Sequence, residues 1–408
     1  MVALILGSIW GTFYLSIRKK IKSGIIYFLF LLCMLFPVTL DRYDFLFYNH
    51  TPSVKNLIIF SLLLIAGFIP WLIFDKWAIN KKFVIPDSSL KYLKIIFKIL
   101  IILSLYSIVY LFPYAKRGLI LGALEIRYLL NSGEEQLLPS SIFTTIAVAS
   151  AALCIFAILF FYISCLTPKL KNYRILLAIS STSYLFNCFA ITARDGLVLI
   201  PIVFIVLFIL FKNSLSTKIN KIIRIALTLF TILTLFIISI FSLSRFYGES
   251  GSINKLYLGT IGYINQQPYV FDDTVEEQND FWGFEERFPL INRILGIPAH
   301  DVNRTDNYFE WSFGTMYAEF YDSFGWNGVF WFTLTYILYY SLALKWLIKN
   351  GRIFGTLLLF CVFLYLAITG MFYYRAGASV SLNIFYLTVS LVPLFVRNLI
   401  ITQEIKKN

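Results

Sequence analysis

The chain has 408 residues, of which 59% are hydrophobic and only 14% are charged. Because soluble globular proteins carry about 25% charged residues, this composition excludes an ordinary soluble fold and indicates a protein that lies in a lipid bilayer. The net charge of +13 is interpreted as a signal of membrane topology and not of nucleic-acid binding, since lysine and arginine gather on the cytoplasmic side of membrane proteins.

Apolar runs of about 17–25 residues are long enough to cross the hydrocarbon core as helices. The sequence contains eleven such runs, which predict an all-α polytopic membrane protein with residues 1–408 in a single integral membrane domain. The predicted spans are Met1–Ile17, Ser23–Leu40, Leu57–Phe74, Ile95–Phe112, Ser141–Leu166, Ile175–Ala193, Gly196–Phe211, Ile225–Ser244, Phe324–Leu347, Ile353–Phe372 and Ser379–Val396.

The basic residues are distributed unevenly around these spans. Of the 35 lysines and arginines, 22 fall on one side, together with only three of the 22 acidic residues. The positive-inside rule makes that side cytoplasmic, with the N-terminus outside and the C-terminus inside. The polar outward segments are Asp41–Lys55, Pro113–Ser140 and a large extracytoplasmic loop over residues 245–323.

The outward segment Pro113–Ser140 carries charged residues among leucines, including Leu119, Leu121, Leu124 and Leu129. This pattern favours an amphipathic helix that lies on the membrane surface. The functional alternative is a lid over a lipid-linked substrate.

Three arginines occur at the outer membrane level, where the positive-inside bias disfavours them. Arg194 lies in a very short turn, Arg245 ends the eighth predicted span, and Arg375 lies between the last two. Arginine binds phosphate oxygens bidentately and stays charged, so the three predict a clamp for a pyrophosphate whose lipid tail lies in the bilayer. The alternative is that lipid headgroups solvate them.

The long outward loop contains several distinct stretches. Asp272–Glu277 is interpreted as a solvated acidic stretch, with Ca²⁺ binding as the weaker alternative. Phe288–His300 has helical apolar periodicity and bears Arg293. Further on, Trp311 and Tyr317 are interleaved with carboxylates, a pattern that suits sugar rings as well as an aromatic belt at the membrane interface.

No metal or cofactor is expected. The five cysteines are scattered singly within apolar runs, and the two histidines do not complete a zinc site with them. The sequence also lacks a Walker A loop, a dinucleotide fingerprint and an HExxH motif.

Three features carry a resemblance to the oligosaccharide repeat-unit polymerases of the Wzy type, the O-antigen polymerases. They are many spans with one dominant late outward loop, the Arg-bearing hairpin Ala193–Leu199, and the Asp322-x-Phe324-Gly325-x-x-Gly328 sequence that follows the loop. The resemblance covers most of the chain in layout and implies a bundle like that of the type C glycosyltransferases. Members usually have an even number of spans, which differs from the eleven predicted here.

The resemblance implies an inverting, metal-independent glycosyltransferase in the bacterial cytoplasmic (inner) membrane. Its substrates would be oligosaccharides linked to undecaprenyl pyrophosphate, and its product O-antigen, capsule or exopolysaccharide. A chain-length regulator and a flippase would be partners. Arg194, Arg245 and Arg375 would neutralise the leaving pyrophosphate, with Arg293, Tyr317 and Trp311 as further substrate contacts.

The general base would be an outward carboxylate or imidazole, with Asp195, His300, Glu319 and Asp322 as candidates. A helix over the stretch Glu319–Asp322 would place both carboxylates on one face. A competing interpretation makes Asp322 only the N-cap of a helix that begins near Phe324.

Three other classes remain open. An acyltransferase would need an outward-facing histidine or aspartate deep in a helix. A lipid-linked oligosaccharide flippase would show charged residues deep in its helices and related halves, and the sequence shows neither. An O-antigen ligase would need its histidine motif, which has no clean match around His300.

Overall fold

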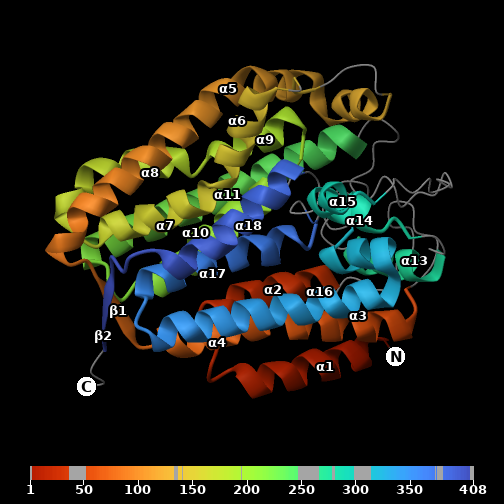
Figure 1. Ribbon diagram of the computed structural model, residues 1–408, viewed down its shortest axis with the longest axis horizontal. Coiled ribbons are helices and arrows are strands. Elements are labelled where there is room, and N and C mark those ends of the chain that lie inside the picture. Colours follow the sequence, from red (N-terminus) through yellow and green to blue (C-terminus); the bar gives the residue numbers. More distant parts are fainter. Residues whose placement is uncertain are drawn as a thin grey trace. The chain divides into compact units, whose positions relative to one another are not determined.

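The computed structural model describes residues 2–35, 52–132, 137–139, 141–193, 195–246, 266–277, 281–297, 314–372, 374 and 380–404. Helices dominate these residues (Figure 1). Each of the eleven apolar runs overlaps a helix, so their helical character is confirmed. The number that span a membrane stays a prediction.

Three helical stretches of the described residues are long and apolar enough to cross a membrane, namely Val54–Ala78, Asp87–Gly122 and Thr217–Ile240. A fourth results if the pair Ile142–Ala152 and Cys154–Cys165, bent by 44°, forms one span. Several shorter helices are also apolar. These features are compatible with an all-α protein embedded in a membrane.

The chain divides into two compact units, and the prediction of a single domain stays open. Unit 1 comprises Met1–Trp77, Ile261–Asn350 and Phe363–Leu394. Its helices are α1 (Val2–Ile17), α2 (Gly24–Leu35), α3 (Val54–Gly67), α4 (Ile69–Ala78), α13 (Gln267–Glu277), α14 (Phe284–Arg287), α15 (Pro289–Leu295), α16 (Met316–Lys349) and α18 (Val380–Phe395).

Unit 2 comprises Ala78–Thr260, Gly351–Val362 and Phe395–Asn408. Helix α17 (Ile353–Thr369) contributes to both units. The remaining elements of unit 2 are β1 (Lys81–Val84), η2 (Asp87–Ser89), α5 (Leu90–Ser132), α6 (Ile142–Ala152), α7 (Cys154–Cys165), η3 (Pro168–Tyr173), α8 (Arg174–Ser180), α9 (Ser183–Ala190), α10 (Asp195–Phe211), α11 (Thr217–Phe246) and β2 (Ile401–Glu404).

Within unit 1, a buried carboxylate fixes the start of α2. Asp75 of α4 accepts hydrogen bonds from the backbone N–H groups of Lys22 (2.7 Å) and Gly24 (2.8 Å) and from the Ser23 hydroxyl (2.6 Å). The first N–H groups of a helix have no partner within the helix, and an acidic side chain there is also favoured by the helix dipole. Asp75 therefore ties α2 to α4.

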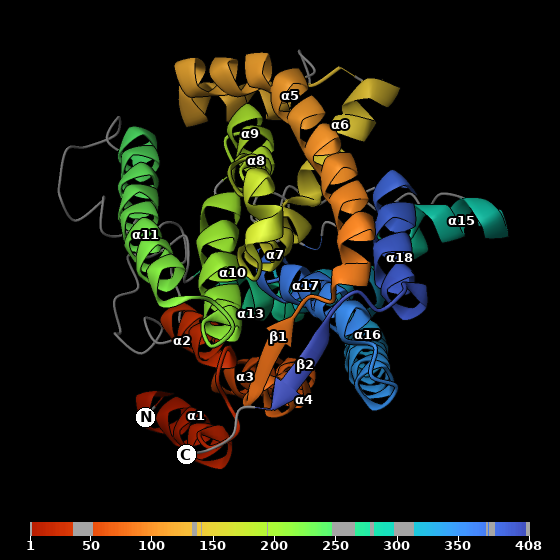
Figure 2. The same cartoon turned by 90° about the vertical axis from the view of Figure 1, so that its left-hand side faces the viewer.

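Within unit 2, the two short strands pair antiparallel, with Lys81 opposite Glu404 (Figure 2). The segment Pro113–Ser140, predicted as a surface helix, lies partly in α5, in which two helices meet at a kink. Helix α5 runs from Leu90 through Pro113 to Ser132, and its backbone departs from helical geometry at Gly122 (φ 81°, ψ 172°) and not at the proline. Glycine tolerates this positive φ because it has no Cβ.

Gly118 allows α5 to approach α9 closely. A Cβ on Gly118 would collide with the carbonyl oxygen of Phe189, which is backbone and cannot swing aside. We therefore expect Gly118→Ala to destabilise unit 2 by about 1–3 kcal/mol, the usual cost of overpacking. The measurement is the midpoint of thermal unfolding of the purified protein in detergent.

Gly11→Ala in α1 is the matched control, since no atom lies within 4 Å of a Cβ built there. Alanine is also the better helix former, so the control should unfold no earlier than the native protein. Equal unfolding midpoints for the two variants would contradict the close approach at Gly118.

Candidate functional site

Helix α16 positions the two carboxylates that the sequence singles out. It begins at Met316, and the side chain of its N-cap, Thr315, accepts a hydrogen bond from the Ala318 N–H (3.3 Å). Asp322 therefore lies inside the first segment of α16 and is not an N-cap, which corrects that interpretation. Gly325 (φ 61°, ψ −156°) breaks the helix, so Glu319 and Asp322 lie together in the segment before the break.

Glu319 forms a buried ion pair with Arg287. Its Oε2 lies 2.6 Å from Nη1 of Arg287, and the two side chains are only 9% and 4% exposed. Arg287 Nε also donates to the Ser323 hydroxyl (2.9 Å), which in turn donates to the Glu319 backbone carbonyl (3.0 Å). The other carboxylate oxygen of Glu319 accepts from the Tyr374 backbone N–H (3.2 Å).

The backbone around α14 is tied to the same segment of α16. The N–H groups of Trp282 and Gly283 donate to the carbonyls of Asp322 (3.3 Å) and Ser323 (2.8 Å). These bonds hold the chain before α14 against the first segment of α16, and Arg287 of α14 therefore lies next to Glu319. Arg287 was not among the residues predicted from the sequence, and the predicted Arg293 is exposed on α15.

A signal for Arg287 was present in the sequence. Phe284 and Phe288 are four residues apart and therefore share a face of one helical turn, and Arg287 lies three residues after the first of them. In the structure the Phe284 ring packs on Phe324 (5.1 Å between centroids) and the Phe288 ring on Phe320 (5.8 Å). Arg287 lies between these two contacts and is itself buried, although Phe284 is 42% exposed.

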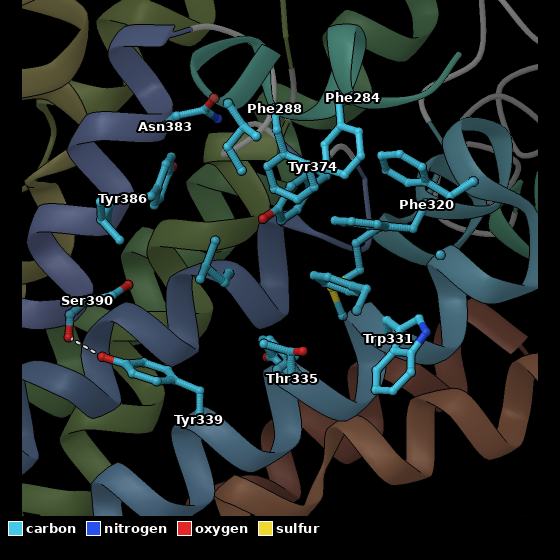
Figure 3. Close-up of a pocket in the computed structure, with 18 of the residues that line it drawn as sticks. Phe284, Phe288, Phe320, Trp331, Thr335, Tyr339, Tyr374, Asn383, Tyr386 and Ser390 are labelled. Atoms are coloured by element: carbon cyan, nitrogen blue, oxygen red, sulfur yellow. Dashed lines mark hydrogen bonds between the residues drawn. The ribbon is translucent and has the colours of Figure 1, made fainter. Parts of the chain in front are cut away.

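Next to this polar network lies a cavity of about 700 Å³, which we name the α16–α18 cavity. Its walls come from α14, α15, α16, α18, Leu366 of α17 and Tyr374 (Figure 3). Aromatic rings gather near α14, where Phe320 stacks on Phe332 (3.9 Å) and meets Tyr374 edge-on (5.1 Å). Burial and the neighbouring Glu319 carboxylate raise the pKa of the Tyr374 hydroxyl, which stays protonated at neutral pH.

The acidic stretch Asp272–Glu277 is not solvated along its length, and that interpretation is corrected. It belongs to α13, where Asp272 is 3% and Asp273 5% exposed. Asp272 accepts from the Ser53 backbone N–H (3.0 Å), the Ser53 hydroxyl (2.9 Å) and the Asn56 amide (2.8 Å). The carboxylate is buried because the start of α3 supplies these donors.

Asn56 also donates to Glu276 (2.9 Å), which completes the connection between α3 and α13. Among the described residues, no group of three or more histidine, cysteine, aspartate or glutamate side chains could hold a metal ion.

Two other predicted site residues have structural roles in the described chain. Tyr317 is buried and its hydroxyl donates to the Leu63 carbonyl of α3 (3.0 Å). Asp195, at the start of α10 in unit 2, is 6% exposed and accepts hydrogen bonds from the Tyr184 hydroxyl (2.7 Å) and the Cys188 thiol (3.4 Å). These contacts hold α10 against α9.

The remaining predicted site residues lie outside the described part of the chain. They are Arg194, His300, Trp311 and Arg375, and Arg245 is described only as backbone at the end of α11. The arginine clamp is therefore still a prediction.

No family model, curated protein or solved structure matches the chain. Its function is therefore argued from the site. The described site combines a carboxylate held by an arginine, a second carboxylate one helical turn further on, and a large apolar cavity whose lining residues Phe320 and Tyr374 adjoin the ion pair. This combination suits an amphiphilic substrate whose polar part reacts and whose apolar part is bound.

Proposed function

We propose that the chain is a membrane glycosyltransferase that polymerises oligosaccharide repeat units linked to undecaprenyl pyrophosphate. The supporting observation is the buried Arg287–Glu319 pair beside the α16–α18 cavity. A lipid-linked saccharide has the matching two parts, a polar sugar pyrophosphate and a long hydrocarbon chain. Dehydrating two charges offsets most of their attraction, so a buried ion pair adds little to the stability of a fold. Stability alone therefore does not explain why this pair is buried, and a role at the site does.

The reaction takes place on the outer face of the bacterial cytoplasmic membrane in this proposal. About eleven spans leave the N-terminus outside, the C-terminus in the cytoplasm and residues 245–323 outside, where α13, α14 and α15 lie. The first segment of α16 then begins at the outer surface, so Glu319 and Asp322 face the compartment in which repeat units are joined.

The topology predicts different accessibility of two loops. Single cysteines at Asn279 and Ser216, in a variant without the five native cysteines, are expected to differ in labelling by a membrane-impermeant thiol reagent in intact cells. Position 279 should be labelled and position 216 only after the membrane is opened, since 22 of the 35 basic residues lie on the side of position 216. Equal labelling in intact cells would contradict the topology.

The chemistry is an inverting displacement at the anomeric carbon of the donor. The acceptor hydroxyl oxygen forms a bond to that carbon, the bond from the carbon to the pyrophosphate oxygen breaks, and the electron pair leaves with undecaprenyl pyrophosphate. A carboxylate accepts the hydroxyl proton. We assign this role to Asp322, which is half-buried and therefore accessible to a substrate, whereas the Glu319 side chain is buried in its ion pair with Arg287.

Arg194, Arg245 and Arg375 neutralise the charge that develops on the leaving pyrophosphate. Arg194→Lys keeps the charge but loses the two-pronged contact, so we expect polymer synthesis to fall about a hundred- to a thousandfold at normal protein level. The same holds for Arg245→Lys and Arg375→Lys. Polymer length and amount on gels are the measurement.

Arg117→Lys and Arg304→Lys are the controls for the clamp, since neither arginine belongs to the predicted group of three. Both should make polymer of normal length. Normal polymer in all three clamp variants would mean that other groups bind the pyrophosphate.

The proposed function is tested by incubating purified protein with radiolabelled lipid-linked repeat units. A ladder of saccharides that grows by whole units is the expected product. A single transfer to a lipid acceptor, without a ladder, would instead indicate a ligase. Transport of the substrate across vesicles without any new glycosidic bond would indicate a flippase.

A further inference from the structure

Helices α8 and α9 of unit 2 together form one apolar run that is interrupted in the middle. Helix α8 ends at Ser180 and α9 begins at Ser183, and each is too short to cross a bilayer by itself. Interrupted helices occur in membrane proteins where the broken backbone is buried in protein or forms a binding site. We call residues 180–183 the α8–α9 break.

The α8–α9 run lies along one face of α5 (Figures 1 and 2). Near one end the Phe97 ring of α5 meets the ring of Tyr173, just before α8, with 5.7 Å between centroids. Near the other end a Cβ on Gly118 of α5 would collide with the carbonyl oxygen of Phe189 in α9. The two contacts fix the register between α5 and the broken helix.

This register places two serines of α5 beside the α8–α9 break. Ser107 lies midway along α5 between the two contacts, and Ser181 lies midway between their partners on the broken helix. Ser104 is one helical turn before Ser107 and is buried on the same face of α5.

Three serine hydroxyls at this level have no hydrogen-bond partner among the described residues. They belong to Ser104, Ser107 and Ser180, each of which is 0% exposed. A serine in a helix can satisfy its hydroxyl by donating to a carbonyl of the preceding turn, as Ser181 does to Ala178 (2.6 Å). A buried hydroxyl without a partner opposes folding, so three at one level indicate a position built for a polar ligand.

The surroundings of the three hydroxyls differ on their two sides. Toward the end of α9, Tyr184 donates to the carboxylate of Asp195 (2.7 Å), which is 6% exposed. Toward the start of α8, the buried neighbours are the apolar residues Phe97 and Leu177. The hydroxyls therefore lie between an apolar region and a buried negative charge.

These surroundings favour a small monovalent cation over other polar ligands. The Asp195 carboxylate repels an anion, and neutral hydroxyl oxygens are ligands for hard cations. A divalent cation such as Ca²⁺ is usually bound by several carboxylates, whereas a single carboxylate balances one positive charge. The break adds backbone carbonyls, because the last carbonyls of a helix lack partners within it.

We propose that unit 2 binds a sodium ion between α5 and the α8–α9 break, through the hydroxyls of Ser104, Ser107 and Ser180. Carbonyls at the end of α8 complete its oxygen ligands, as in other interrupted membrane helices. The ion ties α5 to the broken helix. All of these residues belong to unit 2, and the site goes beyond the proposed function and does not depend on it.

The test measures binding of radioactive sodium to the full-length protein in lipid nanodiscs. We expect saturable binding that an excess of unlabelled sodium displaces and choline does not. Ser107→Ala and Ser180→Ala each remove one ligand oxygen and should weaken binding at least about tenfold, since polar contacts to a charged group are among the stronger ones. Absence of saturable binding, or unchanged binding in both variants, would overturn the proposal.

Thermal unfolding provides a second measurement, in which the same variants act differently with and without sodium. In choline chloride both should unfold no earlier than the native protein, because each removes a buried hydroxyl that has no partner. In sodium chloride at the same concentration the native protein should unfold at a higher temperature than in choline chloride, and the variants should not, because a ligand of the folded state stabilises it. Equal midpoints of the native protein in the two salts would contradict a sodium site.

Ser164→Ala is the matched control in the same unit. Ser164 is also 0% exposed, but its hydroxyl donates to the Phe161 carbonyl (2.7 Å) in α7. This variant should bind sodium as tightly as the native protein. A loss of binding as large as that in Ser107→Ala would show that any buried serine-to-alanine change disturbs unit 2, and would overturn the assignment of the three hydroxyls.

Discussion

Glu319→Leu is expected to destabilise the protein by roughly 3–5 kcal/mol, because it leaves Arg287 as a buried charge without its carboxylate. Arg287 is 4% exposed, and it also donates to the Ser323 hydroxyl, which is neutral. The double variant Arg287→Met/Glu319→Leu removes both charges and should regain most of that stability, since apolar side chains can replace a buried ion pair. Thermal unfolding in nanodiscs measures both effects.

The exposed ion pair of Lys169 and Asp87 is the control. Its atoms are 2.7 Å apart, but the side chains are 55% and 77% exposed, so Asp87→Ala should cost no more than about 1 kcal/mol. A double variant that is as unstable as Glu319→Leu alone would show that the ion pair is not what Glu319 contributes.

Polymer synthesis by the double variant separates a structural role from a functional one. If the Arg287–Glu319 pair positions the first segment of α16 for catalysis, the double variant should fold stably but make little polymer. Normal polymer from a stable double variant would show that the pair acts only in folding.

Most helices could be predicted because a bilayer-spanning helix must satisfy all its backbone groups internally and be apolar along its length. Hydropathy averages over a window, however, and does not see local breaks. The run Leu57–Phe74 contains the boundary between α3 and α4 at Phe68, and Ser141–Leu166 contains the bend between α6 and α7 at Leu153. Gly67 and Pro70 flank the first break, but no glycine or proline lies near the second.

The carboxylates of the site were predicted from the sequence, but the arginine that pairs with Glu319 was not. Glu319 and Asp322 were predicted because they are outward carboxylates just before an apolar span, where the resemblance requires a base, but Arg287 lies 32 residues away from Glu319 in the sequence. Asp272 is a more extreme case, since its partner Ser53 is 219 residues away. A single sequence contains no signal for such pairings, so an acidic stretch looks solvated until the donors that bury it are located.

Asp322→Asn is expected to lower polymer synthesis about 10²–10⁴-fold, the usual contribution of a general base. Asparagine has the same shape and keeps the hydrogen-bond capacity of one oxygen but cannot take a proton at neutral pH. The protein should fold normally, because asparagine has the size of aspartate and the backbone carbonyl of residue 322 still accepts from the Trp282 N–H. Initial rates of ladder formation from radiolabelled repeat units are the measurement.

Asp195→Asn and His300→Gln test the other sequence candidates for the base. Asp195 is engaged by Tyr184 and Cys188 in unit 2, so its substitution should lower stability more than it lowers the rate per folded molecule. His300→Gln should leave the rate nearly normal if Asp322 takes the proton. A normal rate in Asp322→Asn with almost none in His300→Gln would place the base in the loop that follows α15, and the ion pair of Glu319 would then position a segment that is not itself catalytic.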